Sequence, residues 1–130
     1  MSNEQYEAGL AVRKEVLGAE YVERAMAGAD DFNRDFQTMV TEYCWGGPWT
    51  RDDLNKRTRS LLNLAMLSAL NRPDEFKIHL RGALTNGCSL AEIRETLMQV
   101  AVYCGIPAGV EAFRLARQVF TEDGIDTSGS

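Results

Sequence analysis

The only histidine of the chain follows a glutamate at a spacing that suits proton transfer. His79 lies four residues after Glu75 in a segment expected to be helical, so both side chains fall on one face of the helix. A neighbouring carboxylate raises the pKa of an imidazole and holds one tautomer, which favours proton transfer near neutral pH. Such a pair is also found as an inert surface contact, so the spacing alone leaves both interpretations open.

Four arginines lie near this pair along the sequence. Arg57 and Arg59 precede the most apolar segment of the chain, Arg72 closes that segment, and Arg81 follows the histidine by two residues. A guanidinium group binds a carboxylate through two parallel hydrogen bonds, so these arginines fit an anionic substrate. Solvated helix ends are the competing interpretation for each arginine taken alone.

An aromatic segment broken by glycines, residues 43–49, contains Trp45 and Trp49. Such a loop can cover a pocket and exclude water from it. It can equally pack against a neighbouring subunit, and the sequence leaves these two alternatives open.

The three cysteines, Cys44, Cys88 and Cys104, are widely spaced and form no C-x-x-C pair. An odd number of cysteines without that spacing favours reduced thiols in the cytoplasm over a disulfide framework. We expect no metal site, because the single histidine has no partner at ligand spacing.

Hydrophobic periodicity predicts helices along the chain and no strand. We expect helices over residues 5–17, 21–27, 31–43, 54–70, 73–85, 90–104 and 107–120. Two capping boxes support these boundaries, one formed by Thr50 with Asp53 and one by Ser89 with Glu92. The helix over 54–70 is so apolar that we expect it to be buried on most sides, either in the core or in a subunit interface. The fold class is therefore all-α, a bundle of about six to seven helices with short connections.

The length of 130 residues favours one domain, which we expect over residues 1–121 with a flexible polar tail over 122–130. The formal net charge of −5 and the absence of a basic run argue against nucleic acid as a partner. The N-terminal residues show no secretory signal, and the longest apolar run is about half the length of a membrane helix. We expect a cytoplasmic protein with no membrane partner.

Several segments together resemble the carboxymuconolactone decarboxylase family: RTRSLLNLAML (57–67), NRPDEFKIHLRGA (71–83), NGCSLAEI (86–93), QVAVYCGIPA (99–108), FNRDFQ (32–37) and YCWG (43–46). The likeness runs from Val12 to Val119 without a large gap. The resemblance implies an alkylhydroperoxidase-D-like helical fold and a homo-oligomer, usually a hexameric ring. It also implies cofactor-free decarboxylation of 4-carboxymuconolactone to 3-oxoadipate enol-lactone and CO2, in protocatechuate catabolism by the β-ketoadipate pathway.

The chain departs from the peroxide-reducing relatives of that family around the histidine. Those relatives carry a C-x-x-C pair with a histidine four residues after the second cysteine, and a glutamate that activates the thiol. This chain has Arg72 and Glu75 at the cysteine positions, Ser60 at the position of the glutamate, and keeps only His79. The dithiol chemistry therefore has no nucleophile here.

A lactone that loses CO2 next to its ring double bond accepts the released electrons itself, so no cofactor is expected. We expect His79 to stabilise the resulting oxyanion or to donate the proton, with Glu75 setting its tautomer and charge. Arg57 or Arg59, joined by Arg72 or Arg81, would bind the carboxylate groups of a dicarboxylate lactone. The two tryptophans would form apolar walls around the leaving carboxylate.

Three other functions stay open. The chain could be a lyase or isomerase acting on a related lactone, a thiol peroxidase using one of its cysteines, or a non-catalytic assembly subunit in which His79 is structural. The sequence also leaves open which arginine faces the substrate, and whether the site lies within one chain or between subunits.

Overall fold

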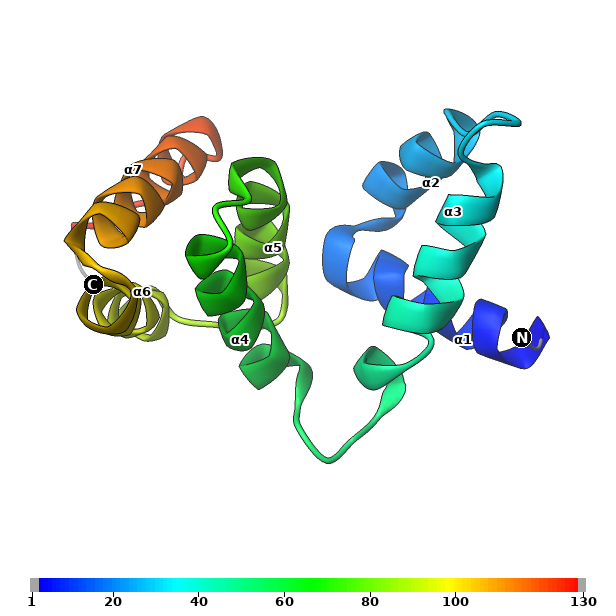
Figure 1. The fold of residues 1–130 in the computed structure, drawn as a ribbon, viewed down its shortest axis with the longest axis horizontal. Coiled ribbons are helices and arrows are strands. Elements are labelled where there is room, and N and C mark those ends of the chain that lie inside the picture. The colour runs from blue at the N-terminus through cyan, green and yellow to red at the C-terminus, as the bar shows by residue number, and fades with distance from the viewer. Residues whose placement is uncertain (1–2, 129–130) are drawn as a thin grey trace. The chain divides into compact units, whose positions relative to one another are not determined.

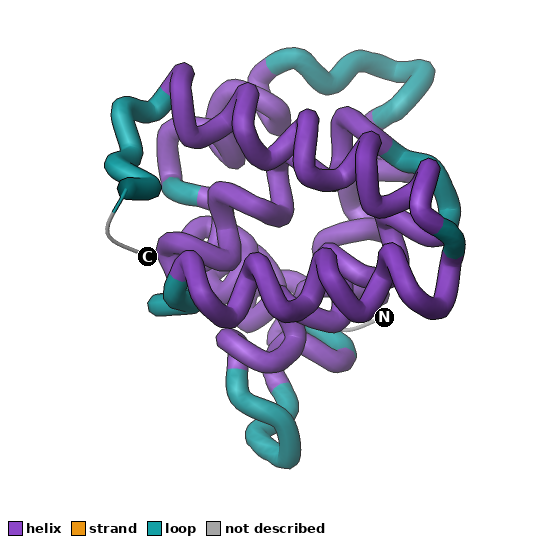
Figure 2. Tube along the Cα trace, turned by 90° about the vertical axis from the view of Figure 1, so that its left-hand side faces the viewer, coloured by secondary structure: helices purple, strands orange, loops and turns teal. Residues whose placement is uncertain are grey.

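The computed structural model describes residues 3–128, and every regular element among them is helical (Figures 1 and 2). In chain order these elements are α1 (Asn3–Leu17), α2 (Ala19–Ala27), α3 (Arg34–Met39), the π-helical turn η1 (Val40–Trp45), the 3₁₀ turn η2 (Pro48–Thr50), α4 (Lys56–Ala69), α5 (Pro73–Thr85), α6 (Leu90–Cys104) and α7 (Ile106–Glu122). The predicted all-α fold class is therefore confirmed. No helix within the described residues is both long and apolar enough to cross a bilayer.

The chain divides into two compact units, unit 1 (Met1–Lys56) and unit 2 (Arg57–Ser130). The expectation of one domain over residues 1–121 stays a prediction. The last two residues of the expected flexible tail, 129 and 130, lie outside the described residues.

Unit 1 is built around a close contact between α1 and η1. A Cβ atom added to Gly9 would overlap the carbonyl oxygen of Thr41 and lie 2.7 Å from the backbone nitrogen of Gly46. Only glycine at position 9 lets the two backbones approach this closely. Next to this contact, Trp45 and Trp49 stack with ring centroids 4.9 Å apart and pack against the apolar side of α1.

A buried arginine ties α1 to the segment that follows α3. Arg13 is only 6% exposed, and its Nη1 donates hydrogen bonds to Oε1 of Gln37 at 3.1 Å and to Oγ1 of Thr41 at 3.3 Å. Burial lowers the pKa of this guanidinium group. Because a buried polar group costs stability without a partner, these two bonds help to fix the position of η1.

Two expectations about the middle of the chain are wrong. The helix expected over 31–43 begins at Arg34 and changes into the π-helical turn at Val40. The capping box of Thr50 with Asp53 does not form, because the Thr50 hydroxyl donates to the carbonyl oxygens of Gly46 and Gly47 instead. That hydroxyl closes the 3₁₀ turn, and α4 begins only at Lys56.

Unit 2 consists of α4 to α7, coloured from green to orange in Figure 1, and α7 packs against both α5 and α6. Its core combines one buried residue of α4 with residues of the later helices, and is formed by Leu64, Phe76, Leu80, Ala83, Cys88, Ile93, Leu97, Ala112, Leu115, Ala116 and Val119. The other side of α4 remains exposed in this unit, with Leu62, Met66 and Leu70 at 45%, 51% and 60%. Of the two places expected for burial of this helix, the core takes one side of it, and burial of the other side in a subunit interface stays a prediction.

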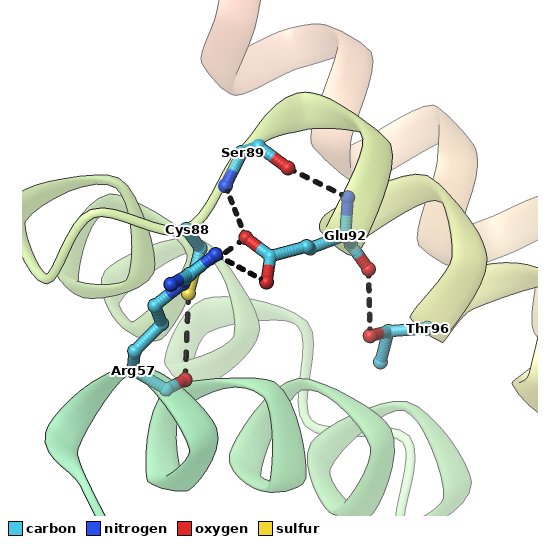
Figure 3. A network of polar contacts seen from close by, with 5 residues as sticks. All are labelled: Arg57, Cys88, Ser89, Glu92 and Thr96. Carbon is cyan, nitrogen blue, oxygen red and sulfur yellow. Dashed lines mark hydrogen bonds and ion pairs between the residues drawn. The ribbon is translucent and has the colours of Figure 1, made fainter.

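Local signals at the helix ends of unit 2 are confirmed. Ser89 and Glu92 form the predicted capping box, in which the backbone nitrogen of Glu92 donates to Oγ of Ser89 at 3.0 Å (Figure 3). The backbone nitrogen of Ser89 donates in return to Oε1 of Glu92 at 2.9 Å. Gly105, with a φ of 106°, turns the chain directly from α6 into α7.

We expect Gly9→Ala to lower the free energy of unfolding by about 1–3 kcal/mol, because overpacking against backbone atoms forces the two elements apart. Urea-induced unfolding followed by circular dichroism measures this change. The matched control is Gly28→Ala, whose new Cβ meets no atom closer than 3.5 Å in a right-handed backbone conformation. Equal losses in the two variants would show that the α1–η1 contact is not a constraint on stability.

Candidate active site

The single histidine of the chain lies between α5 and α4 of unit 2. His79 is half-buried, and its Nδ1 is 3.4 Å from Nδ2 of Asn63 on α4. The imidazole therefore does not project into bulk water. Sequence reasoning missed Asn63 as its neighbour, although a polar residue inside the apolar run of α4 is a signal that such a partner exists.

The surroundings of His79 act on its charge in opposite directions. Burial lowers the pKa of the imidazole below its ordinary value, and the negative charge of Glu75 partly opposes that effect. Glu75 itself is exposed, one turn earlier on α5. The charge of Glu75 acts on the pKa of His79 in the expected direction, but burial is the larger effect. The result favours a neutral imidazole at neutral pH.

A second polar contact joins α4 and α5 beyond the histidine. Ser60 is fully buried, and its Oγ accepts a hydrogen bond from Nδ2 of Asn86 at 2.9 Å. Together with the contact between Asn63 and His79, this bond fixes how α4 lies along α5. Ser60 therefore has a structural part in this chain.

Arg72 lines a cavity of about 270 Å³ at the amino-terminal ends of α5 and α7. Its other lining residues are mainly apolar and include Phe76, Pro107 and Ala108. His79 is not among them, and it follows Arg72, the residue before α5, by seven positions in the sequence. Nη1 of Arg72 donates to the carbonyl oxygen of Leu70 at 3.0 Å, and the side chain is exposed. Arg72 is thus positioned to meet an anion.

Two of the predicted substrate-binding arginines are engaged with carboxylates of their own unit. Arg57 forms a two-pronged ion pair with Glu92, at 3.1 Å from Nε and 2.5 Å from Nη2 (Figure 3). Arg81 binds Asp123 at 2.9 Å and Glu122 at 2.7 Å. These pairings raise the pKa of both arginines. Both arginines therefore join helices of unit 2. A substrate could bind either of them only by displacing these carboxylates.

The fourth predicted arginine lies on the side of α4 that faces the histidine helix. Arg59 is half-buried and precedes Asn63 by one helical turn, so the two side chains share a face of α4. Arg59 and Arg72 are therefore better placed than Arg57 and Arg81 to contact an anionic ligand.

The tryptophans lie in the core of unit 1. Trp45 and Trp49 are 5% and 7% exposed and pack with Val16. Their expected places, over a pocket or against a neighbouring subunit, stay predictions. Stacking on each other explains why a loop this rich in aromatic residues folds inward.

The cysteines offer little for thiol chemistry. Cys88 is buried, its Sγ donates to the carbonyl oxygen of Arg57 at 3.4 Å, and burial raises the pKa of its thiol. Cys44 and Cys104 are exposed, and they belong to different units. Among residues 3–128, no group of three or more histidine, cysteine, aspartate or glutamate side chains is arranged to hold a metal ion.

Comparison with known proteins gives consistent matches. The model of the carboxymuconolactone decarboxylase family matches residues 34–118. The chain is 42% identical to a 4-carboxymuconolactone decarboxylase of Acinetobacter baylyi over 126 residues, which cover 96% of this chain and 94% of that protein. It is 40% identical to a nitrosuccinic acid decarboxylase of Metarhizium robertsii over 117 residues, covering 90% of this chain and 82% of that protein. A 4-carboxymuconolactone decarboxylase of Pseudomonas putida is 42% identical over 43 residues, covering 33% of this chain and 90% of that protein.

We expect the His79 imidazole to titrate below its ordinary pKa of 6.5, because burial disfavours its charged form. Proton NMR follows this titration without assignment, since the chain has one histidine. Glu75→Gln should lower the midpoint further, because it removes the charge that favours protonation. Glu95→Gln, an exposed change on α6, is the matched control and should leave the midpoint unchanged.

The sign of the effect on stability follows from the same shift. As pH falls below 6.5, the unfolded chain takes up the histidine proton before the folded chain does. This histidine therefore makes the free energy of unfolding decrease between pH 6.5 and its lower folded midpoint. A midpoint above 6.5 would contradict the burial of the imidazole.

Proposed function

We propose a function from the premise that this chain belongs to the carboxymuconolactone decarboxylase family, whose model matches residues 34–118. The chain is a carboxy-lyase that converts 4-carboxymuconolactone to 3-oxoadipate enol-lactone and CO2. One observation carries this proposal, the 42% identity over 96% of the chain to a protein of that name from Acinetobacter baylyi. The reaction belongs to protocatechuate breakdown by the β-ketoadipate pathway.

The substrate is an unsaturated five-membered lactone that carries one carboxylate on its saturated ring carbon. The bond from that carbon to the carboxylate breaks, and CO2 leaves. The electron pair of the broken bond moves through the ring double bond to the lactone carbonyl oxygen and gives an enolate. A proton then adds to the ring carbon next to that carbonyl, which leaves the double bond shifted by one position. The protein has to bind the carboxylates, stabilise the oxyanion and supply the proton.

His79 is the group that stabilises the oxyanion in this proposal. Its lowered pKa keeps the imidazole neutral at pH 7, and a neutral ring has one N–H group that can donate a hydrogen bond to the oxyanion. One donor aimed at a developing oxyanion contributes about 3–4 kcal/mol to transition-state stabilisation. The half-buried position strengthens that interaction, because less water competes for the oxyanion.

Arg72, with Arg59, binds the carboxylate groups. The chain as a whole has a net charge of −5, so a dianionic substrate needs local positive charge to be held. The cavity beside Arg72 has the dimensions of a small-molecule site and is mostly apolar. An apolar wall next to a carboxylate favours its loss as neutral CO2.

A second substrate class is favoured by the 40% identity to a nitrosuccinic acid decarboxylase. Nitrosuccinic acid also carries two carboxylates, and its nitro group accepts the electron pair that decarboxylation releases. Both reactions need anion binding and a hydrogen-bond donor for an oxygen that gains negative charge. The two substrates should therefore be assayed side by side.

Thiol-dependent peroxidase activity is the weaker alternative. The buried Cys88 has a raised thiol pKa, so little of it is present as the reactive thiolate at neutral pH. The chain also has no C-x-x-C pair.

The chain acts as a cytoplasmic homo-oligomer, a hexamer by the family resemblance. In support, unit 2 exposes a continuous series of apolar side chains at the end of α6 and the start of α7: Met98, Val102, Tyr103, Ile106 and Val110. A patch of this kind suits burial against a second copy better than contact with water. Light scattering of the purified protein is expected to give a multiple of the chain mass, and a monomer would contradict this expectation.

We expect the purified protein to release CO2 from 4-carboxymuconolactone in the presence of EDTA. His79→Leu should lower kcat by at least about tenfold, because it removes the imidazole donor while keeping much of its volume. Arg72→Gln should raise KM more than it lowers kcat, because it removes a charge that binds substrate and intermediate alike.

Arg94→Gln changes an exposed arginine of α6 and serves as the matched control. CO2 release from nitrosuccinate alone would transfer the proposal to that substrate. The absence of CO2 from both compounds, or full activity of His79→Leu, would refute the proposed role of this site.

A further inference from the structure

The contact between Asn63 and His79 carries information about where the imidazole proton lies. Nδ2 of Asn63 is 3.4 Å from Nδ1 of His79. An amide nitrogen has two hydrogens to donate and no lone pair to accept with, so the imidazole nitrogen facing it must be the acceptor. In a neutral imidazole only one nitrogen carries hydrogen, which then has to be Nε2.

We propose that Asn63 is a positioning residue that holds His79 in the Nε2-protonated tautomer. The part of this inference that concerns catalysis rests on the proposed function, in which the Nε2–H group donates to the lactone oxyanion. The tautomer itself is a property of the free protein and can be measured without substrate.

The sequence around Asn63 supports this assignment independently. Asn63 interrupts the apolar run of α4 between Leu62 and Leu64, and its side chain is half-buried. A buried amide costs stability unless it is hydrogen-bonded, so an apolar residue would be the simpler choice for packing alone. The position of the amide is also fixed, because the bond between Ser60 and Asn86 holds α4 along α5 close by.

Glu75 and Asn63 have different effects on the same ring. Glu75 is exposed and acts on His79 through its charge, which favours protonation. Asn63 is uncharged and lies against Nδ1, so it selects which nitrogen keeps the proton of the neutral ring. In this proposal the two roles expected of Glu75 belong to two residues. Glu75 influences the charge of His79, and Asn63 selects its tautomer.

Nitrogen NMR of the whole, uniformly 15N-labelled protein tests this proposal directly. The chain has one histidine, so a long-range proton–nitrogen spectrum shows one imidazole. Well above the titration midpoint, we expect a protonated, pyrrole-type Nε2 and an unprotonated, pyridine-type Nδ1. The reverse pattern in the unmodified protein would overturn the proposal without any variant.

Two substitutions give opposite expectations for that spectrum. Asn63→Asp places an acceptor at the same point, so the proton should move to Nδ1. Asn63→Leu removes the donor at similar volume, so the two nitrogens should show averaged shifts of a tautomer mixture. Gln99→Leu removes an exposed amide on α6 and is the matched control, expected to keep the Nε2–H pattern. Unchanged spectra in both Asn63 variants would overturn the proposal.

CO2 release then separates this inference from the proposed function. With the tautomer reversed, Asn63→Asp should lower kcat by about a hundredfold or more and change KM little, as a misplaced proton does in other histidine-dependent enzymes. If the unmodified protein shows the Nε2–H tautomer but releases no CO2, the proposed function fails and the tautomer assignment stands. If it is active and Asn63→Asp has full kcat despite a reversed tautomer, the positioning role fails.

Discussion

A single imidazole held between α4 and α5 is the feature on which the proposed site of unit 2 depends. Burial favours its neutral form, a nearby carboxylate limits that effect, and an amide on the facing helix meets one of its nitrogens. Each effect requires α4 and α5 to keep one alignment. The apolar core beneath them, with Leu64, Phe76 and Leu80 fully buried, supplies that alignment. The histidine thus receives its chemical properties from packing as much as from neighbours in sequence.

Ion pairs in unit 2 distinguish the arginines that join helices from the arginine at the cavity. Arg57 and Arg81 each meet carboxylates of a distant part of the chain, and these pairs connect α4 to α6 and α5 to the end of α7. Exposed ion pairs contribute little stability individually, but they occupy the guanidinium groups in a defined geometry. Arg72 differs because it lies at a cavity and its one hydrogen bond is to a carbonyl oxygen. Which arginines are held in ion pairs therefore depends on the groups that lie near them in the fold, and not on the residue type.

Features set by neighbouring residues could be predicted from the sequence, and features set by distant residues could not. Proline at the start of α5, the Ser89–Glu92 capping box and the helical periodicity are local, and all three were predicted correctly. The π-helical turn packs closely against Gly9, which lies more than 30 residues earlier in the chain, so no local sequence pattern predicts this turn. The carboxylates that occupy Arg57 and Arg81 are 35 and 42 residues away in sequence. At the candidate site, His79 and Glu75 could be named from the sequence. Asn63 could be recognised only once α4 was seen to lie against His79.

The burial of both tryptophans in unit 1 also determines what light can report about this molecule. The chain has two tryptophans, and both belong to the stacked core pair. Tryptophan emission therefore reports on the core of unit 1, in which both rings are buried. An unfolding curve recorded by emission and one recorded by far-ultraviolet ellipticity weigh the two units differently. If the two curves coincide, the two units unfold together, and if the curves separate, the units unfold independently.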